Sequence, residues 1–232
     1  TVRLFFYSEA DNLVANDDNG VGDIFCYFRE EDRIVRISEG ADGSSFNAAT
    51  SVGQPTFDGR YYVFATEASN VVPGDSNGVS DVFLKDVDTG QVTLLSAGLN
   101  GQPGNGPSTN PTVDHYADRT YFSSSATNLV ENDNNGMTDI FVYDRSFSRV
   151  IGRVNFDLDG APPHGGSNSP QLCSVSRDGA WVAFTSDAAY SFPGLRVGDR
   201  NLYLTNSNID SVLLPDISIF ERLTSDRVPT LG

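Results

Sequence analysis

Short runs of aromatic and β-branched residues alternate with polar turn residues along the whole chain. Typical runs are RYYVFAT at 60–66, DVFLKD at 81–86 and GQVTLLS at 90–96. Apolar runs of this length, bounded by Gly, Asp and Asn, predict β-strands that are joined by tight turns. We find no segment with the 3.6-residue apolar spacing of an amphipathic helix. The pattern therefore predicts an all-β protein.

The same succession of runs returns at a fixed interval. The segments DIFCYF, DVFLKD and DIFVYD begin at Asp23, Asp81 and Asp139, 58 residues apart. A fourth, altered copy begins with WVAFTSDAAY at Trp181 and is offset by 62 residues. Self-similarity at a fixed period is the signature of a repeat architecture. We expect one domain over 1–232, with repeats at about 1–52, 53–109, 110–168 and 169–226.

Each repeat contains the signals for four short strands. In the second repeat these are the run that begins with QPTFDG at 54–59 and the three runs quoted above. A single four-stranded sheet cannot bury both of its faces, whereas sheets stacked around an axis bury them against one another. We therefore predict a β-propeller with four four-stranded blades.

The two ends of the chain match adjoining parts of one repeat. The C-terminal RVPTLG at 227–232 matches GQPTFDG at 53–59, and the N-terminal VRLFFYS at 2–8 matches RYYVFAT. We expect 227–232 to complete the first blade by pairing with the N-terminal strand, which would leave no free sheet edge. The alternatives are that these ends pair between chains, or that further blades belong to the complete protein.

The charge of the chain limits its partners. Asp and Glu outnumber Lys and Arg by 31 to 15, which gives a net charge of −16. Nucleic acids and anionic membrane surfaces bind basic patches, so neither is expected as a partner. A strongly acidic chain instead favours solubility or the binding of cations.

Targeting signals and cysteines add little. No apolar run approaches the ~18 residues of a transmembrane helix, so we predict no membrane insertion. No signal peptide follows Thr1, so the chain is either cytosolic or a mature or truncated form.

The chain has two cysteines, Cys26 and Cys173, which are too few for a disulfide framework or a zinc site. We expect two buried free thiols, with a single bridge as the alternative.

Three repeats share the pattern Asp-x-Asn-Gly-x-x-Asp between their second and third strands, as NDDNGVGD, GDSNGVSD and NDNNGMTD. Calcium binds carboxylate, amide and carbonyl oxygens, and the glycine permits a tight turn that directs these groups inward. We predict Ca²⁺ as a cofactor, at up to three sites. The predicted ligands are Asp17, Asn19 and Asp23, then Asp75, Asn77 and Asp81, then Asp133, Asn135 and Asp139.

The alternative is that these loops are plain turns. Asn-Gly and Asp-Gly sequences form turns without metal, and Asx side chains cap their own backbone. Asn12, Asn70 and Asn128 recur just before the loops, and we expect them to form turns rather than to bind an ion. The fourth loop, 194–201, has Leu and Val at two ligand positions, so we expect no ion there.

Catalytic signals are weak. Neither His115 nor His164 recurs in the other repeats, and both are expected to be exposed loop residues. No G-x-S-x-G elbow, which carries the nucleophile of many hydrolases, is present. We align Trp181 with Tyr62 and expect it in the core of a blade. The long Gly/Ser/Asn-rich connections and the Asp loops should crowd one face of the propeller, where binding is expected. We predict that the protein is not an enzyme.

The segment PTFDGRYYVFATEASNVVPGDSNGVSDVFLKD at 55–86 resembles the TolB-like, WD40-like β-propeller repeats of bacterial periplasmic and surface proteins. The resemblance extends over nearly the whole chain and implies the fold much more than the function. Two features depart from it. Such propellers usually have six blades, whereas we count four repeats, and the fourth loop has lost the acidic pattern.

These observations lead to three hypotheses of function. The first is a non-enzymatic, calcium-stabilised module that binds a protein partner or self-associates. The second is a calcium-dependent, lectin-like carbohydrate-binding module, and the third is a propeller hydrolase. We expect the protein to be extracellular, on the cell surface or periplasmic.

Overall fold

The computed structural model describes residues 2–40, 42–51, 53–155, 171–186, 201–206 and 221–222. These residues form fifteen β-strands and no helix, as the alternation of apolar and polar residues predicts. Within this part of the chain there is accordingly no helix that could span a membrane.

The strands assemble into four antiparallel sheets, in which neighbouring strands also follow one another along the chain. The first sheet contains β1 (Arg3–Ser8), β2 (Asp23–Phe28) and β3 (Arg33–Arg36). The second contains β4 (Gln54–Pro55), β5 (Tyr61–Thr66), β6 (Asp81–Asp86) and β7 (Val92–Leu94). The third contains β8 (Ser108–Val113), β9 (Arg119–Ser124), β10 (Asp139–Asp144) and β11 (Arg149–Arg153). The fourth contains β12 (Gln171–Val175), β13 (Trp181–Ser186), β14 (Asn201–Asn206) and β15 (Glu221–Arg222).

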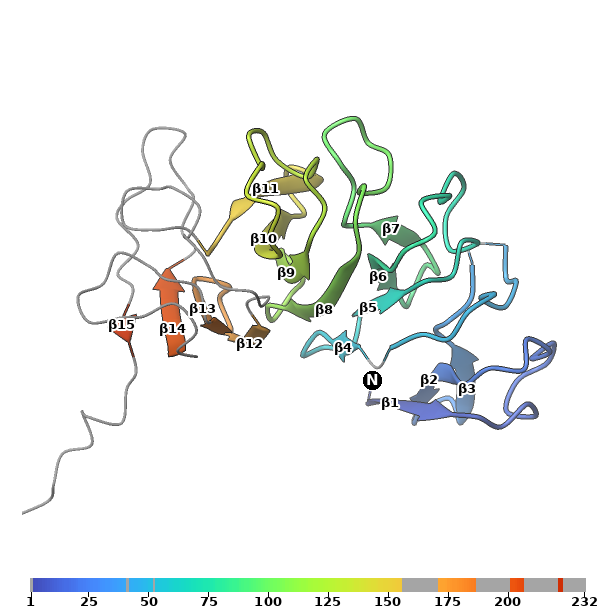
Figure 1. The fold of residues 1–232 in the computed structure, drawn as a ribbon. Coiled ribbons are helices and arrows are strands. Elements are labelled where there is room, and N and C mark those ends of the chain that lie inside the picture. The colour runs from blue at the N-terminus through green and yellow to red at the C-terminus, as the bar shows by residue number, and fades with distance from the viewer. Residues whose placement is uncertain are drawn as a thin grey trace, which may run out of the picture.

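The four sheets follow one another along an arc in chain order (Figure 1). The first sheet, in blue, and the fourth, in orange, lie at opposite ends of the arc. Each sheet is a meander of the kind that forms one blade of a β-propeller. The fold is therefore that of a β-propeller, as the repeat predicts.

The central pair of strands keeps the same register in every sheet. The strand before each of the three Asp loops ends opposite the aspartate that begins the next strand, in the pairs Ser8↔Asp23, Thr66↔Asp81 and Ser124↔Asp139, and Ser186↔Asn201 is the corresponding pair of the fourth sheet. The 58-residue period of the sequence is thus a structural period, and the Asp loops are the hairpin connections that close it.

Both faces of the inner sheets are buried because neighbouring sheets stack. The two faces of β5 are an example: Phe64 packs toward the first sheet and Val63 toward the third. Aromatic stacks reinforce these interfaces, with ring centroids 5.0 Å apart for Phe5 and Tyr62, which join the first sheet to the second. Successive side chains of a strand point to opposite faces of its sheet, so they pack alternately against the sheet before and the sheet after it.

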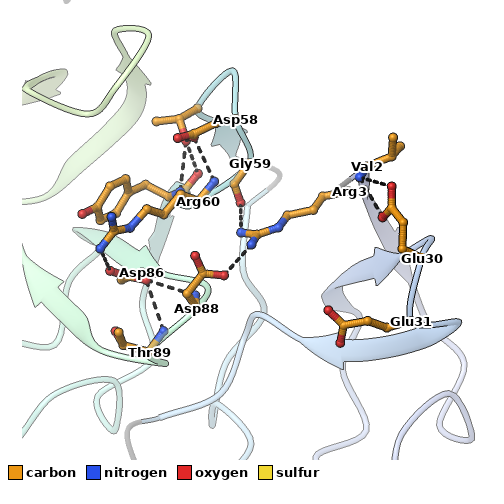
Figure 2. Close-up of polar contacts among 12 residues, drawn as sticks. Val2, Arg3, Glu30, Glu31, Asp58, Gly59, Arg60, Asp86, Asp88 and Thr89 are labelled. Atoms are coloured by element: carbon orange, nitrogen blue, oxygen red, sulfur yellow. Dashed lines mark hydrogen bonds and ion pairs between the residues drawn. The ribbon is translucent and has the colours of Figure 1, made fainter.

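Polar contacts tie the first two sheets together beside this core (Figure 2). Arg3 Nη1 donates to the carbonyl oxygen of Gly59 at 2.8 Å, and its other terminal nitrogen pairs with Asp88. In the same view Arg60 forms an ion pair with Asp86 at 3.1 Å, within the second sheet. The arginine of β1 therefore reaches into a turn of the next blade.

The first sheet has only three strands among the described residues, so β1 lies at its edge. The expected partner of β1, residues 227–232, lies outside the described residues. Closure of the ring by these residues therefore stays a prediction, as does pairing between chains. Cys26 is a buried free thiol, and burial raises its pKa to about 11, whereas the side chain of Cys173 lies outside the described part.

Candidate metal and binding sites

The three Asp loops share one backbone conformation. Their first residue has a positive φ in each case, 61° at Asn16, 87° at Gly74 and 59° at Asn132. The glycine four residues later also has a positive φ, between 67° and 71° in the three copies. Asn and Gly are the residues that adopt this left-handed region most readily. The loops therefore recur in sequence because two positions in each of them demand these residues.

The asparagine of each loop forms a turn on itself. In the second loop, Asn77 Oδ1 accepts a hydrogen bond from the N–H of Val79 at 3.2 Å, and its amide nitrogen donates to Asp81 at 2.6 Å. Asn19 and Asn135 make the same pair of bonds. The side-chain oxygens of all three asparagines thus accept a hydrogen bond within the turn, and their side-chain nitrogens face the last aspartate of the loop.

The last aspartate of each loop is hydrogen-bonded to a residue just after the last described strand of its sheet. Asp81 is fully buried, and its Oδ1 accepts a hydrogen bond from Ser96 Oγ at 2.5 Å. The same Ser96 oxygen accepts from the N–H of Val82 at 3.0 Å. Ser38 and Asn155 make the corresponding bonds in the first and third sheets. The sequence prediction missed these partners, although Ser recurs 15 residues after the aspartate in two repeats.

The first aspartate of two loops pairs with an arginine that is buried in the first loop and partly buried in the third. Arg36 lies 3.2 Å from Asp17, and Arg153 lies 3.1 Å from Asp133 and 3.0 Å from Asp139. Both arginines end the last described strand of their own sheet, β3 for Arg36 and β11 for Arg153. These pairs could not be predicted from the loop motif, because the arginines lie on a strand outside it.

The second loop has a leucine where the others have an arginine. Leu94 lies opposite Phe83 in the sheet, as Arg36 lies opposite Phe25 and Arg153 opposite Phe141. In the described part of the chain, no basic residue forms an ion pair with Asp75 or Asp81.

Burial raises the pKa of the first aspartate in all three loops, and in the sister loops Arg36 and Arg153 oppose this rise for Asp17 and Asp133. Burial, followed by the nearby Asp81 carboxylate, raises the pKa of Asp75 to about 6. Burial also raises the pKa of Asp81, against the hydrogen bonds from Ser96 and Asn77. The second loop is therefore the most cation-deficient of the three.

The remaining predicted features of this face have different outcomes. Asn70 and Asn128 hold the long connections: Asn70 Oδ1 accepts from the N–H of Asn47 at 2.9 Å, and Asn128 Oδ1 accepts from that of Asn105 at 3.0 Å. The amide nitrogens of Asn19 and Asn77 also donate to backbone carbonyls of these connections, so the first two Asp loops lie beside them. The fourth loop, 194–200, is outside the described residues. Clusters of three or more His, Cys, Asp or Glu residues that could hold a metal do not occur in the described part.

Trp181 is not in the core of a blade, so that prediction was wrong. It pairs with Asn206 at the start of the hairpin, the position that Tyr61 and Arg119 occupy opposite Asp86 and Asp144. The alignment with Tyr62 was shifted by one residue, and a shift of one residue moves a strand side chain to the other face. Trp181 is 37% exposed.

His115 also differs from a free loop residue. It is half-buried, and its ring stacks on Phe57 with a centroid distance of 4.4 Å. Its Nε2 lies 3.0 Å from the guanidinium of Arg177. Because a guanidinium only donates, Nε2 must accept, and the ring proton is then on Nδ1. His164 lies outside the described residues.

Known structures place this geometry in a class. No family model matches the chain, and no curated protein matches it. The fold is similar to that of a TolB from Agrobacterium tumefaciens, with 19% identity, a TM-score of 0.50 and coverage of 88% of this chain. This likeness gives the class, the β-propellers. The chain spans 57% of that TolB.

Two protease structures align with TM-scores of 0.47. The tricorn protease has 12% identity over 81% of this chain and 16% of its own, and the β-propeller domain of the Trilobed protease from Pyrococcus furiosus has 9% identity over 88% and 49%.

Proposed function

We propose that this chain is a non-enzymatic β-propeller module that binds a protein partner outside the cytoplasm and is stabilised by Ca²⁺ at its second Asp loop. The observation that carries the ion site is the Asp75–Asp81 pair, which lacks the arginine that its sister loops have. Two neighbouring buried carboxylates repel one another unless a cation or a proton compensates their charge.

The residues of this loop fit a hard cation in part. Asp75 and Asp81 would supply carboxylate oxygens, and the backbone carbonyl of Val79 is a further candidate ligand. Asn77 would have to rotate its amide so that the oxygen faces Asp81, at the expense of its bond from Val79 N–H and of the bonds it donates to Asp81 and to the Gly104 carbonyl. The ion would supply the positive charge that arginine supplies in the sister loops.

The other two loops fit an ion less well. A cation at Asp17 or Asp133 would compete with Arg36 or Arg153, whose side chains are 2% and 13% exposed. A cation bound to the aspartate would lie close to the positive guanidinium, and two like charges repel strongly in a buried site. The prediction of up to three calcium ions therefore narrows in this proposal to one.

The proposed protein partner is supported by the face that carries the loops. Asn70 and Asn128 fasten the long connections to the loops of the next sheet, so that loops from successive sheets lie side by side. Loops held on a rigid scaffold are frequent binding surfaces. A site outside the cytoplasm agrees with the resemblance to TolB-like repeats, and low-affinity calcium sites are typical of extracellular modules.

A charge swap tests the ion site. Metal-stripped protein should melt at a higher temperature when Ca²⁺ is added. At a calcium concentration 100 times Kd, the free energy of unfolding should rise by about 2.7 kcal/mol. Leu94→Arg should raise the melting temperature without calcium and abolish the response to calcium, because the arginine takes the place of the ion. Leu94→Gln introduces a polar but uncharged side chain at the same position and is the matched control. This variant should keep the rise in melting temperature with calcium.

Elemental analysis of the calcium-saturated protein should give one ion per chain. A melting temperature that ignores calcium, with no bound metal, would remove the ion from the proposed function. A stoichiometry of three would restore the original prediction and show that the arginines yield to the ion.

A further inference from the structure

The turns between the first and second strands of the last three sheets form a continuous strip on the face away from the Asp loops. Their backbones are bonded to one another: Phe57 N–H donates to the carbonyl of His115 at 3.3 Å, and His115 N–H to that of Arg177 at 3.1 Å. The side chains of the same three residues are also in contact: the His115 ring stacks on Phe57 and bonds to Arg177, whose guanidinium lies 5.7 Å from the centroid of the Phe57 ring. The three turns are therefore joined through both backbone and side chains.

A hollow of about 620 Å³ opens between the turns of the third and fourth sheets, and aromatic rings form part of its lining. Tyr116 is 55% exposed and Trp181 37%. Large aromatic side chains that are exposed in a concave site commonly mark a binding surface.

The remaining lining is mostly acidic. It includes the carboxylates of Asp114, Asp118 and Asp178, against the single guanidinium of Arg177. That guanidinium is engaged by His115. The hollow thus has an excess of negative charge beside two aromatic faces.

The three carboxylates are held in fixed positions. Asp114 is buried and accepts three backbone N–H bonds, from Tyr116, Asp118 and Arg119. Asp178 accepts from Ser176 Oγ at 2.6 Å and from the N–H of Ala180 at 3.0 Å, both through Oδ1. These bonds lower the pKa of Asp178, so it stays ionised at neutral pH.

Asp118 is the third carboxylate. It pairs with Arg145 through Oδ1 at 2.7 Å, and its side chain is 67% exposed. The carboxylates of Asp118 and Asp178 thus each retain a second oxygen for a ligand.

We propose that this hollow binds an arginine side chain of the protein partner. A guanidinium group stacks on Trp and Tyr rings and accepts no hydrogen bonds, so it fits aromatic faces beside carboxylates. It also pairs with a carboxylate through two parallel N–H bonds. The inference rests on the proposed function in that the partner is a protein, but it is independent of the calcium site.

The single tryptophan of the chain makes this site observable. Fluorescence of Trp181 is titrated with the peptide acetyl-Gly-Arg-Arg-Gly-amide and with the same peptide in which citrulline replaces arginine. Citrulline has nearly the same shape but no charge. We expect saturable quenching with the arginine peptide only, weakened by salt because the pairing is electrostatic.

Four variants define the recognition. Asp178→Asn and Tyr116→Ala should each weaken binding of the arginine peptide about tenfold, because each removes one kind of contact. Arg177→Gln should tighten binding about threefold, since it removes the one cation of the lining. Leu99→Ala, a change at an exposed apolar residue of the long connections, is the control and should leave binding unchanged.

Several outcomes would overturn the inference. Equal binding of the citrulline peptide, weaker binding after Arg177→Gln, or no quenching by the arginine peptide would each do so. Quenching by neutral chitotetraose without quenching by the peptide would assign the hollow to carbohydrate instead. The calcium response of the melting temperature, measured on the same samples, shows separately whether the proposed ion site stands.

Discussion

The second and third Asp loops have nearly the same sequence but different electrostatics. Both place two carboxylates at the same positions, and both hold the second carboxylate by the end of the fourth strand. In the third loop Arg153 forms ion pairs with both carboxylates and compensates part of their charge, whereas in the second the equivalent residue is Leu94. The difference teaches that the charge state of a repeated loop is decided by a strand that lies outside the repeated motif.

The largest effect is expected when the third loop is made to resemble the second. Arg153→Leu would leave Asp133 and Asp139 buried without a cation, and breaking a buried ion pair costs about 3 kcal/mol or more. Urea unfolding should show this loss in calcium-free buffer. Calcium should restore part of the stability, as in the second loop.

Arg149→Leu is the control for this variant, because Arg149 is an exposed residue of the same strand. It should change the free energy of unfolding little. An Arg153→Leu protein as stable as the wild type would show that the arginine contributes nothing net, and the comparison of the two loops would lose its basis.

A smaller effect is expected from the feature that the two loops share. Ser96→Ala removes the hydroxyl that bonds both Asp81 and Val82 N–H, and an unsatisfied buried group costs about 1–3 kcal/mol. Asn155→Ala should cost a similar amount in the third loop, where Asn155 makes the same two bonds. Chemical denaturation of both variants tests this; a loss in one loop alone would mean that the shared aspartate has different roles in the two.

The smallest effect concerns pH. The pKa of Asp75 is raised to about 6 in the folded protein, above its ordinary value of 3.8. Its stabilising contribution is complete below pH 3.8, where it is protonated in both states, and is lost as the pH rises through about 6. Without calcium, Asp75→Asn should therefore gain stability relative to the wild type between pH 4 and pH 7, by roughly 1 kcal/mol after allowance for solvent screening.

Melting curves of metal-stripped protein at the two pH values measure this difference. With calcium at pH 7 the order should reverse, because the variant lacks a ligand. The same relative stability at both pH values would contradict a raised pKa for Asp75.

Much of the fold could be predicted from the sequence because its signals are local. The strand that begins at Asp81 is bounded by a turn, and its residues alternate between two buried faces. The positive φ of Gly78 and Gly136 follows from the same local chemistry, since glycine occupies that conformation at least cost. Stacking of the repeats then follows from the need to cover both faces of each sheet.

The partners of the loop residues were decided only by the tertiary structure. Arg153 reaches Asp133 because β11 pairs with β10 through a register shift at Val142 and Tyr143, which moves it one residue from the 58-residue period that relates Arg36 to Leu94. No property of the loop itself encodes that contact. The exposure of Trp181 likewise depends on a register of one residue.

The sequence by itself therefore determined where strands, turns and carboxylates lie along the chain, because these depend on neighbours within a few residues. The tertiary structure decided which carboxylates are neutralised and which rings face solvent. Those properties depend on strands that meet across a sheet or between sheets, where a single substitution such as Leu for Arg changes the local charge without changing the fold.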